Sequence, residues 1–536
     1  MAAIVYQTDK RSGITYAYES VSFWDREKQQ SRSKRTLIGR VDTKTGEIIP
    51  TDGRGRKKKE ISLPANRGPV PITETARFFY GATYLLDAIG EKLGINDDLK
   101  QCFPNTYRKI LSLAYYLILE DKNPLYRFEK WSSLHKHPYG KNITSQRSSE
   151  LFASIDEEAK NTFFRLQGKR RAEKEYWAYD ITSISSYSEY IRQVQYGKNK
   201  ENDALPQLNL ALIFGETSNL PFYYRKLAGN IPDSKTIKNL LADLDVLGFT
   251  KVKLVMDRGF YSEDNINALF KNHLKFLISA KMSLAFIRKE LDSIYDGFRS
   301  FDHYSENYEL YYHTVPTEWQ YTNYRPYKGD YVTESRRIYL HFYYNIDKAA
   351  EDEKVFDRKL MALLHELESG KRIPEHETLY KKYFETKTTP KRGTKVVVKE
   401  EAVRNAKRYF GFFALMTNET MSAITALELY RNKDIVEKAF GNLKERLNMR
   451  RTLVSSEQSL DGKLFVEFVA LIFLSYIKKQ MQETGLFENF TLQSVLDKLD
   501  VIECFEVPGC KLRVGELLEK QKVIYKCLNV PPPTSL

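Results

Sequence analysis

The order of strand and helix patterns between residues 175 and 281 constrains the fold of this chain most strongly. Runs rich in β-branched and aromatic residues predict strands, and amphipathic stretches that begin at polar caps or end at glycine predict helices. The predicted strands are 175–185, 206–215, 219–230, 251–257 and 275–281. The predicted helices are 232–249 and 262–274. Three strands followed by helix, strand, helix and strand predict a mixed α/β layer built on an antiparallel meander.

Two of these predicted strands carry an aspartate. Asp180 lies within "YWAYDITS", and Asp257 directly follows an apolar run in "KLVMDRGFYS". If the two strands are neighbours, both carboxylates meet at one edge of the sheet and can hold Mg²⁺, which prefers oxygen ligands. The alternative for each aspartate is a cap or a salt bridge that closes a strand.

A third acidic candidate lies on a long helix predicted over 425–447. Tyr430 is followed by Lys433, Glu437 and Lys444 at offsets of three, seven and fourteen residues. These offsets place all four side chains on one face of a helix. The alternative is a solvated face with no function.

Taken together, "YWAYDITS", "MDRGFYS" and the Tyr-x2-Lys-x3-Glu-x6-Lys helix resemble the three motif blocks of the DDE transposases of bacterial insertion sequences. The branch they resemble has a Tyr-Arg-Glu-Lys signature and a β-rich insertion before the final glutamate. The resemblance covers about residues 170–480. It implies an RNase H-like catalytic domain in which Asp180, Asp257 and Glu437 are the catalytic triad and bind two Mg²⁺ or Mn²⁺ ions.

The same resemblance implies that Tyr430, Lys433 and Lys444 hold phosphates at the transposon end. Lys433 stands where the signature has arginine. A lysine keeps the positive charge but lacks the planar fork that binds two oxygens at once. We therefore expect a weaker or redirected contact at this position.

Further DNA contacts are expected near the triad, from Arg258 and from Arg446 and Arg450 in "RLNMRRTL". The alternative for the last two is a basic helix end that favours its own dipole. Trp319 lies in the insertion, where an indole can stack on an unpaired base; a packed tryptophan is the alternative.

Two other short motifs are weaker candidates. Asn230 and Lys235 precede or begin a predicted helix and are candidate DNA contacts. His135 and His137 form a His-x-His motif that can bind a metal, although such a motif without partners usually has no such role.

The chain divides by pattern into six regions. We predict a small β-rich domain with a basic linker, a helical DNA-binding region, two parts of an RNase H-like core separated by a β-rich insertion, and a C-terminal helical region. In that order, with the insertion between the core parts, the ranges are 1–62, 63–170, 171–281, 282–409, 410–480 and 481–536.

The overall charge favours an anionic partner. Lysine and arginine number 84 and aspartate and glutamate 70, which gives a net charge of +14. We expect double-stranded DNA rather than a membrane surface. A cytoplasmic protein is predicted by four cysteines with no zinc spacing, by the lack of a signal-peptide pattern and by an apolar run at 464–477 that is too short to span a bilayer. The resemblance to bacterial transposases implies in addition that the protein is associated with the nucleoid.

The first hypothesis is a transposase that binds the terminal inverted repeats of an insertion sequence, cleaves the ends and joins them to target DNA. Bringing two ends together implies a homodimer. The alternatives are a catalytically inactive or repurposed DNA-binding relative, and a metal-dependent nuclease without strand transfer.

Overall fold

The structure is a computed structural model that describes residues 2–25, 28–50, 75–120, 123–170, 175–188, 190–197, 204–325, 327–389, 393–447, 451–452 and 456–534. The chain forms two compact units. One comprises Met1–Thr75 with Val507–Cys510, and the other comprises Ala76–Glu506 with Lys511–Leu536.

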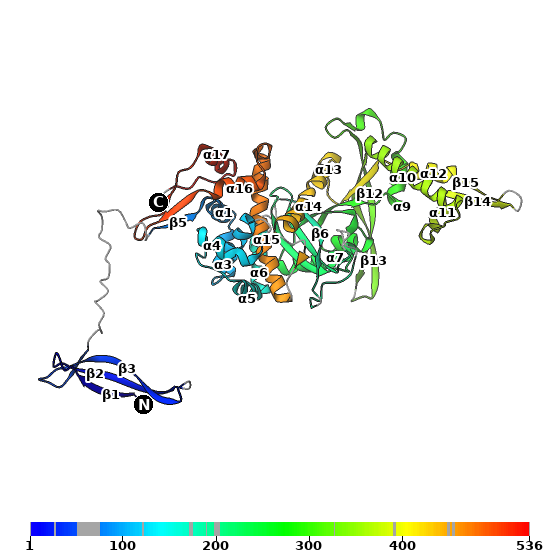
Figure 1. Cartoon of the computed structure of the whole chain (residues 1–536). Coiled ribbons are helices and arrows are strands. Elements are labelled where there is room, and N and C mark those ends of the chain that lie inside the picture. The colour runs from blue at the N-terminus through cyan, green and yellow to red at the C-terminus, as the bar shows by residue number, and fades with distance from the viewer. Residues whose placement is uncertain are drawn as a thin grey trace. The chain divides into compact units, whose positions relative to one another are not determined.

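The N-terminal unit contains one four-stranded antiparallel sheet (Figure 1). Its strands lie in chain order and are β1 (Ala2–Thr8), β2 (Thr15–Asp25), β3 (Gln30–Val41) and β4 (Ile48–Pro50). The predicted β meander is thus confirmed. The basic stretch 52–60 of the predicted linker lies outside the described residues.

The central sheet belongs to the larger unit and carries the predicted α/β layer. Its strand order is β11-β12-β13-β16-β10-β9-β6-β7-β8, and the short β17 pairs with β6. The core strands are β6 (Trp177–Ser186), β7 (Gln207–Gly215), β8 (Pro221–Ala228), β9 (Lys253–Met256), β10 (Lys275–Ala280), β16 (Phe412–Thr417) and β17 (Arg451–Thr452). With α7 (Asp233–Leu247) and α8 (Glu263–Lys271) between them, the order predicted for 175–281 is confirmed.

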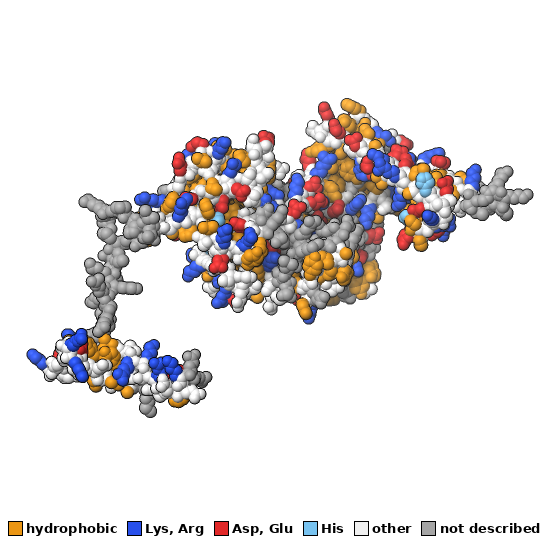
Figure 2. Space-filling model, in the orientation of Figure 1, with side chains coloured by type: hydrophobic (Ala, Val, Ile, Leu, Met, Phe, Trp, Pro, Cys, Tyr) orange, Lys and Arg blue, Asp and Glu red, His pale blue; other side chains and the backbone are white. Residues whose placement is uncertain are grey.

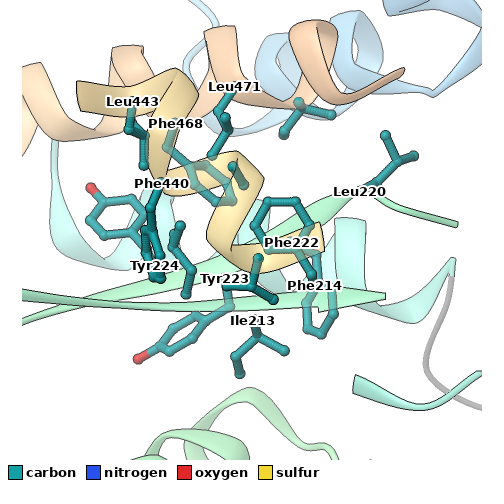
Figure 3. Close-up of a cluster of buried hydrophobic side chains, with 14 of the residues drawn as sticks. Ile213, Phe214, Leu220, Phe222, Tyr223, Tyr224, Phe440, Leu443, Phe468 and Leu471 are labelled. Carbon is teal, nitrogen blue, oxygen red and sulfur yellow. The ribbon is translucent and has the colours of Figure 1, made fainter. Parts of the chain in front are cut away.

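Parallel pairing joins β6 to β9 and β9 to β10, while β6, β7 and β8 form the antiparallel meander. The face of β7 and β8 is covered by apolar side chains from two later segments. Figure 3 shows Phe440, Leu443, Phe468 and Leu471 together on one side of these strands, and the Phe468 ring meets that of Tyr224 on β8 at 5.1 Å. Phe468 and Leu471 lie on α15 (Glu457–Glu483), whose run from Leu464 to Ile477 is buried. This burial confirms a core helix at 464–477.

A helical region packs around the same long helix. Its elements are β5 (Ala76–Phe79), α1 (Gly81–Lys92), α2 (Ile95–Cys102), α3 (Tyr107–Leu119), α4 (Phe128–Leu134), α5 (Ser145–Ala153) and α6 (Glu157–Lys169). Helices α3 and α5 contact α15. The C-terminal elements α16 (Leu492–Asp500), β18 (Glu503–Glu506), β19 (Arg513–Val514) and α17 (Glu519–Cys527) return to this region, and β18 pairs with β5.

The insertion between β10 and β16 has two parts. In the first, α9 (Ala285–Ile294) precedes β11 (Tyr304–Ser305) and a long hairpin of β12 (Leu310–Arg325) and β13 (Asp330–Tyr344). This hairpin extends the central sheet, because β13 pairs with β16. The second part has its own small apolar core and contains α10 (Ile346–Glu368), α11 (Glu377–Tyr383), β14 (Phe384–Thr389), β15 (Gly393–Val398) and α12 (Glu400–Lys407).

The long helix predicted over 425–447 is present, but it is interrupted at Lys433 and ends in a π-helical turn. It consists of α13 (Ala423–Asn432), α14 (Asp434–Gly441) and a π-helical turn (Asn442–Arg446). At the junction, the Lys433 amide donates to the Tyr430 carbonyl at 3.2 Å, and the Val436 amide donates to the Lys433 carbonyl at 2.9 Å. These i to i−3 bonds tighten the backbone locally and replace the regular helical pattern.

Within the part of the chain that the structure describes, no helix is both long enough and apolar enough to cross a membrane.

Candidate active site

Two aspartates come together because their strands are parallel neighbours. Tyr179 of β6 pairs with Met256 at the end of β9, and Asp180 and Asp257 are the next residues along each strand. Adjacent strands lie about 4.8 Å apart. The two aspartates therefore occupy neighbouring positions at one edge of the sheet, as the sequence predicts.

The Asp257 carboxylate is held in its charged form. Its Oδ1 accepts hydrogen bonds from the Tyr430 hydroxyl at 2.7 Å and from the Arg258 amide at 2.8 Å. Burial alone would raise the pKa of Asp257, but these hydrogen bonds and the positive charges of Lys433 and Arg258 outweigh burial and lower that pKa. Asp257 is thus a carboxylate that stays ionised although it is half-buried.

Tyr430 reaches this carboxylate from α13. Burial, followed by the charge of Asp257, raises the pKa of its hydroxyl well above the usual range, so the hydroxyl remains a proton donor. A hydrogen bond with Ser279 on β10 acts in the opposite direction. Sequence reasoning missed Ser279, and the only available signal was its place in the strand pattern "KFLISAK".

Lys433 is the central cation of the site. Its side chain is only 4% exposed, and Nζ lies 3.3 Å from Oε1 of Glu437. Burial alone would lower the pKa of Lys433, but the negative charges of Asp180, Asp257 and Glu437 raise it. One buried ammonium group therefore stands among three carboxylates that come from two strands and a helix.

Glu437 completes this group from α14. Its side chain is 61% exposed, in contrast to the buried lysine with which it pairs. Asp180, which is half-buried, accepts a hydrogen bond at Oδ1 from the Ile181 amide at 2.8 Å. Both groups are negatively charged oxygen donors at the same cation.

This donor set suits divalent metal ions. Mg²⁺ and Mn²⁺ prefer carboxylate oxygens, and the Lys433 ammonium shows that a cation is stabilised between these three side chains. Within the described ranges, however, no three or more His, Cys, Asp or Glu side chains lie close enough together to form a finished metal cluster. The three carboxylates are suitable ligands for a divalent ion. In this structure the Lys433 ammonium supplies the positive charge beside them.

Comparison with known proteins identifies the family of this chain. The family model described as "Transposase DDE domain" matches residues 162–473. The chain belongs to the DDE transposase family. The resemblance carried by the three motif blocks is thereby confirmed, and divalent metal ions are generally used in this family.

One solved structure similar to this transposase is the cryo-EM structure of the piggyBac transposase synaptic complex with hairpin DNA. The sequence identity is 8%, the TM-score is 0.35, and the match covers 78% of this chain and 76% of that chain. No curated protein matched the sequence.

The expected DNA contacts of the transposase fall into different environments. Arg258 is exposed beside Asp257, and Lys444 is half-buried on the π-helical turn. Arg446 donates a hydrogen bond to Gln493 of α16 and thus contacts the protein interior. Arg450 lies outside the described residues.

Trp319 is packed into the transposase and is not presented to solvent. Its side chain is buried, its Nε1 donates to Oδ1 of Asn267 at 2.9 Å, and its ring meets that of Phe286 edge-on at 5.8 Å. Stacking on an unpaired base would require the indole to leave these partners. The structure therefore favours the packed alternative over the base contact.

The weaker motifs separate in the same way. His135 and His137 are buried, and their Nδ1 atoms bond to the Trp131 carbonyl and the Ser112 hydroxyl, each at 2.9 Å. They support the packing of the helical region rather than a metal site. Asn230 and Lys235 are both exposed near the start of α7 and remain predicted DNA contacts.

Proposed function

We propose that this transposase cleaves the ends of an insertion sequence and joins them to target DNA by metal-dependent phosphoryl transfer. The observation that carries the proposal is that Asp180 and Asp257 lie next to each other on neighbouring strands, while the buried Lys433 ammonium, whose charge they influence, lies 3.3 Å from Glu437. Three carboxylates around one cation are what a two-metal phosphoryl-transfer site needs.

In this proposal the three carboxylates hold two Mg²⁺ or Mn²⁺ ions. When bound, such ions activate the attacking oxygen and stabilise the leaving oxygen of a phosphodiester. Tyr430 is a positioning residue, since its hydroxyl fixes the Asp257 carboxylate at 2.7 Å. It also keeps that carboxylate ionised and ready to bind a cation.

Lys433, Lys444 and the exposed Arg258 are proposed to neutralise phosphates at the bound DNA end. Charge neutralisation and positioning account for most of the catalysis in reactions of this kind, because no protein nucleophile is needed. Arg446 and Arg450 remain proposed DNA contacts from the sequence, and in the structure Arg446 donates a hydrogen bond to Gln493.

The proposed partners are double-stranded DNA at the terminal inverted repeats and at the target, and a second copy of the chain that brings two ends together. The excess of basic residues supports a DNA partner. We propose that the protein acts at the nucleoid of the bacterial cytoplasm.

The test uses the full chain and duplex DNA taken from both sides of its gene, where the terminal inverted repeats should lie. With Mg²⁺, the wild type should nick at the repeat end and join the freed 3′-hydroxyl to a target plasmid. Asp257→Ala should bind the same DNA and cut none. The matched control Asp264→Ala removes an aspartate from the first turn of α8, away from the carboxylate group.

Each alternative has its own outcome. Specific binding by the wild type without any cutting would identify a DNA-binding relative that has lost catalysis. Cutting without joining would identify a nuclease without strand transfer. Equal cutting by Asp257→Ala would refute the assignment of the site.

A further inference from the structure

A second site with unused positive charge lies beside the carboxylate group. A cavity of about 710 Å³ is lined by α14, α15, the π-helical turn and the turn between β7 and β8. Lys438 and Lys478 both line it, together with Asn442 and Ser475. Sequence reasoning did not single out either lysine, because 40 residues separate them and neither belongs to a motif.

The two lysines lack the partners that such groups usually have. Among the residues that the structure describes, neither forms an ion pair with a carboxylate, and the hydrogen-bond acceptor of Lys478 Nζ is the neutral Asn442 side chain. Burial lowers the pKa of Lys478, and the positive charges of Arg446 and Lys438 lower it further. The negative charge of Glu445 opposes this effect only in part. Two cations thus repel each other across a concave surface, which is a favourable setting for an anion.

Carboxylates also line the cavity, but two of the three are engaged elsewhere. Glu216 accepts a hydrogen bond from Asn432, and Glu483 accepts one from Gln480 at 2.7 Å and lies 3.6 Å from Lys479. The third, Asp434, lies in the first turn of α14. Among the described residues, none of the three forms an ion pair with Lys438 or Lys478.

The position of the cavity relates it to the proposed reaction. Lys438 directly follows Glu437, so the two side chains point about 100° apart around the same helix. Asp434, Lys438 and Asn442 therefore form the stripe next to Lys433 and Glu437. A DNA strand with one phosphate at the carboxylates would pass over this neighbouring stripe as it continues.

Surface charge by itself does not identify such a site. Figure 2 shows basic and acidic side chains intermixed over the visible face of the molecule. The distinguishing feature is local, namely two unpaired lysines and neutral hydrogen-bonding groups in one cavity.

We propose that Lys438 and Lys478 bind a backbone phosphate of the DNA strand that leaves the active site. Asn442 and the Ser475 hydroxyl provide neutral hydrogen-bonding groups beside that phosphate. This inference rests on the proposed function, because it assigns a second contact to the same DNA substrate.

The experiment measures the affinity of the full chain for end DNA as a function of salt concentration. The logarithm of the association constant falls with the logarithm of salt by about 0.9 for each phosphate neutralised on duplex DNA. Because both lysines contact the same phosphate, Lys438→Gln and Lys478→Gln should each reduce this slope by up to about one and weaken binding by up to about tenfold at low salt. Lys478→Gln keeps an amide that can donate to Asn442, and Lys438 is exposed, so at least one variant should fold normally.

Lys520→Gln is the matched control, because it removes the same charge from an exposed position on α17. It should leave the slope unchanged. Wild-type slopes for both cavity variants, or an equal loss in all three variants, would overturn the proposal.

Two further arms separate the sources of phosphate and the two proposals. In the first arm, inorganic phosphate is titrated without DNA. If Lys478→Gln abolishes phosphate binding but leaves the affinity for DNA unchanged, the ligand of the cavity is a small phosphate compound and the DNA contact is overturned. Asp257→Ala tests cleavage without altering the cavity. Cutting by Asp257→Ala at the wild-type level would count against the proposed function, whereas the salt slopes decide the cavity independently.

Discussion

Glu467 lies in the buried middle of the long helix α15. Its replacement by glutamine should stabilise the protein at alkaline pH. The residue is fully buried, and neither carboxylate oxygen accepts a hydrogen bond from the described residues. Lys463 Nζ lies 3.6 Å from Oε1, which is too far for a hydrogen bond. A buried charge with so little compensation costs stability.

The cost depends on pH in a defined direction. Burial raises the pKa of Glu467 from 4.5 to about 7, although the charge of Lys463 opposes this. Between these values the folded protein holds a proton that the unfolded chain releases, so stability falls as pH rises and the penalty is complete above pH 7. The difference corresponds to about 3 kcal/mol, since a tenfold change in an equilibrium constant is about 1.4 kcal/mol.

Urea unfolding of the wild type and Glu467→Gln, measured from about pH 5 to about pH 8.5, tests this reasoning. The two proteins should be nearly equally stable at the acidic end, and the variant should be more stable by up to about 3 kcal/mol at the alkaline end. The control is Glu483→Gln on the same helix. Its partner Lys479 also lies 3.6 Å away at the same spacing, but Glu483 is 52% exposed, so no pH-dependent difference should appear. A difference between wild type and Glu467→Gln that does not change with pH would refute the argument.

Three other predictions concern the site and its support. Lys433→Ala should weaken end binding or cleavage by about 1–3 kcal/mol, whereas Lys433→Arg should be tolerated; wild-type binding and cutting by Lys433→Ala would show that this lysine is dispensable. The same Lys433→Ala protein without metal should melt at a lower temperature than the wild type at neutral pH, because three carboxylates lose their shared cation, and an unchanged melting temperature would contradict this. Gly462→Ala should lower the melting temperature, because a Cβ there would meet the Phe152 carbonyl oxygen at 2.0 Å; normal melting would mean that α5 and α15 can separate without cost.

Local sequence patterns predicted the strand and helix order around Asp180 and Asp257. Each element there has a regular spacing of apolar residues and is bounded by polar residues or a glycine. The pairing of β6 with β9 then brought the two aspartates together. The same reasoning predicted one long helix around Glu437, since residue spacing carries no signal for the i to i−3 bonds at Lys433. It also assigned Lys433 a phosphate contact, which stays a prediction. The spacing gave no signal that this lysine is buried beside Asp180, Asp257 and Glu437.

Contacts between distant segments account for most of what sequence could not predict. The strand pattern of β13 was recognised, but its pairing with β16, about 75 residues later, depends on the whole sheet. Lys438 and Lys478 are unremarkable on their own helices and become a pair only when α14 packs beside α15. Trp319 is another example, because its burial depends on Asn267 and Phe286 from outside its own strand.

The pairing of β13 with β16 also determines which part of the insertion can be exchanged by protein engineering. Removing β12 and β13 would strip the hydrogen-bonding edge of β16 and expose a strand able to pair with other chains, so aggregation should follow. Residues 346–407 are different, because they enter after β13, leave before β16 and enclose an apolar core of their own. Residues 346–407 can therefore be replaced as a unit. A short linker or a foreign module can be joined between Tyr344 and Tyr409.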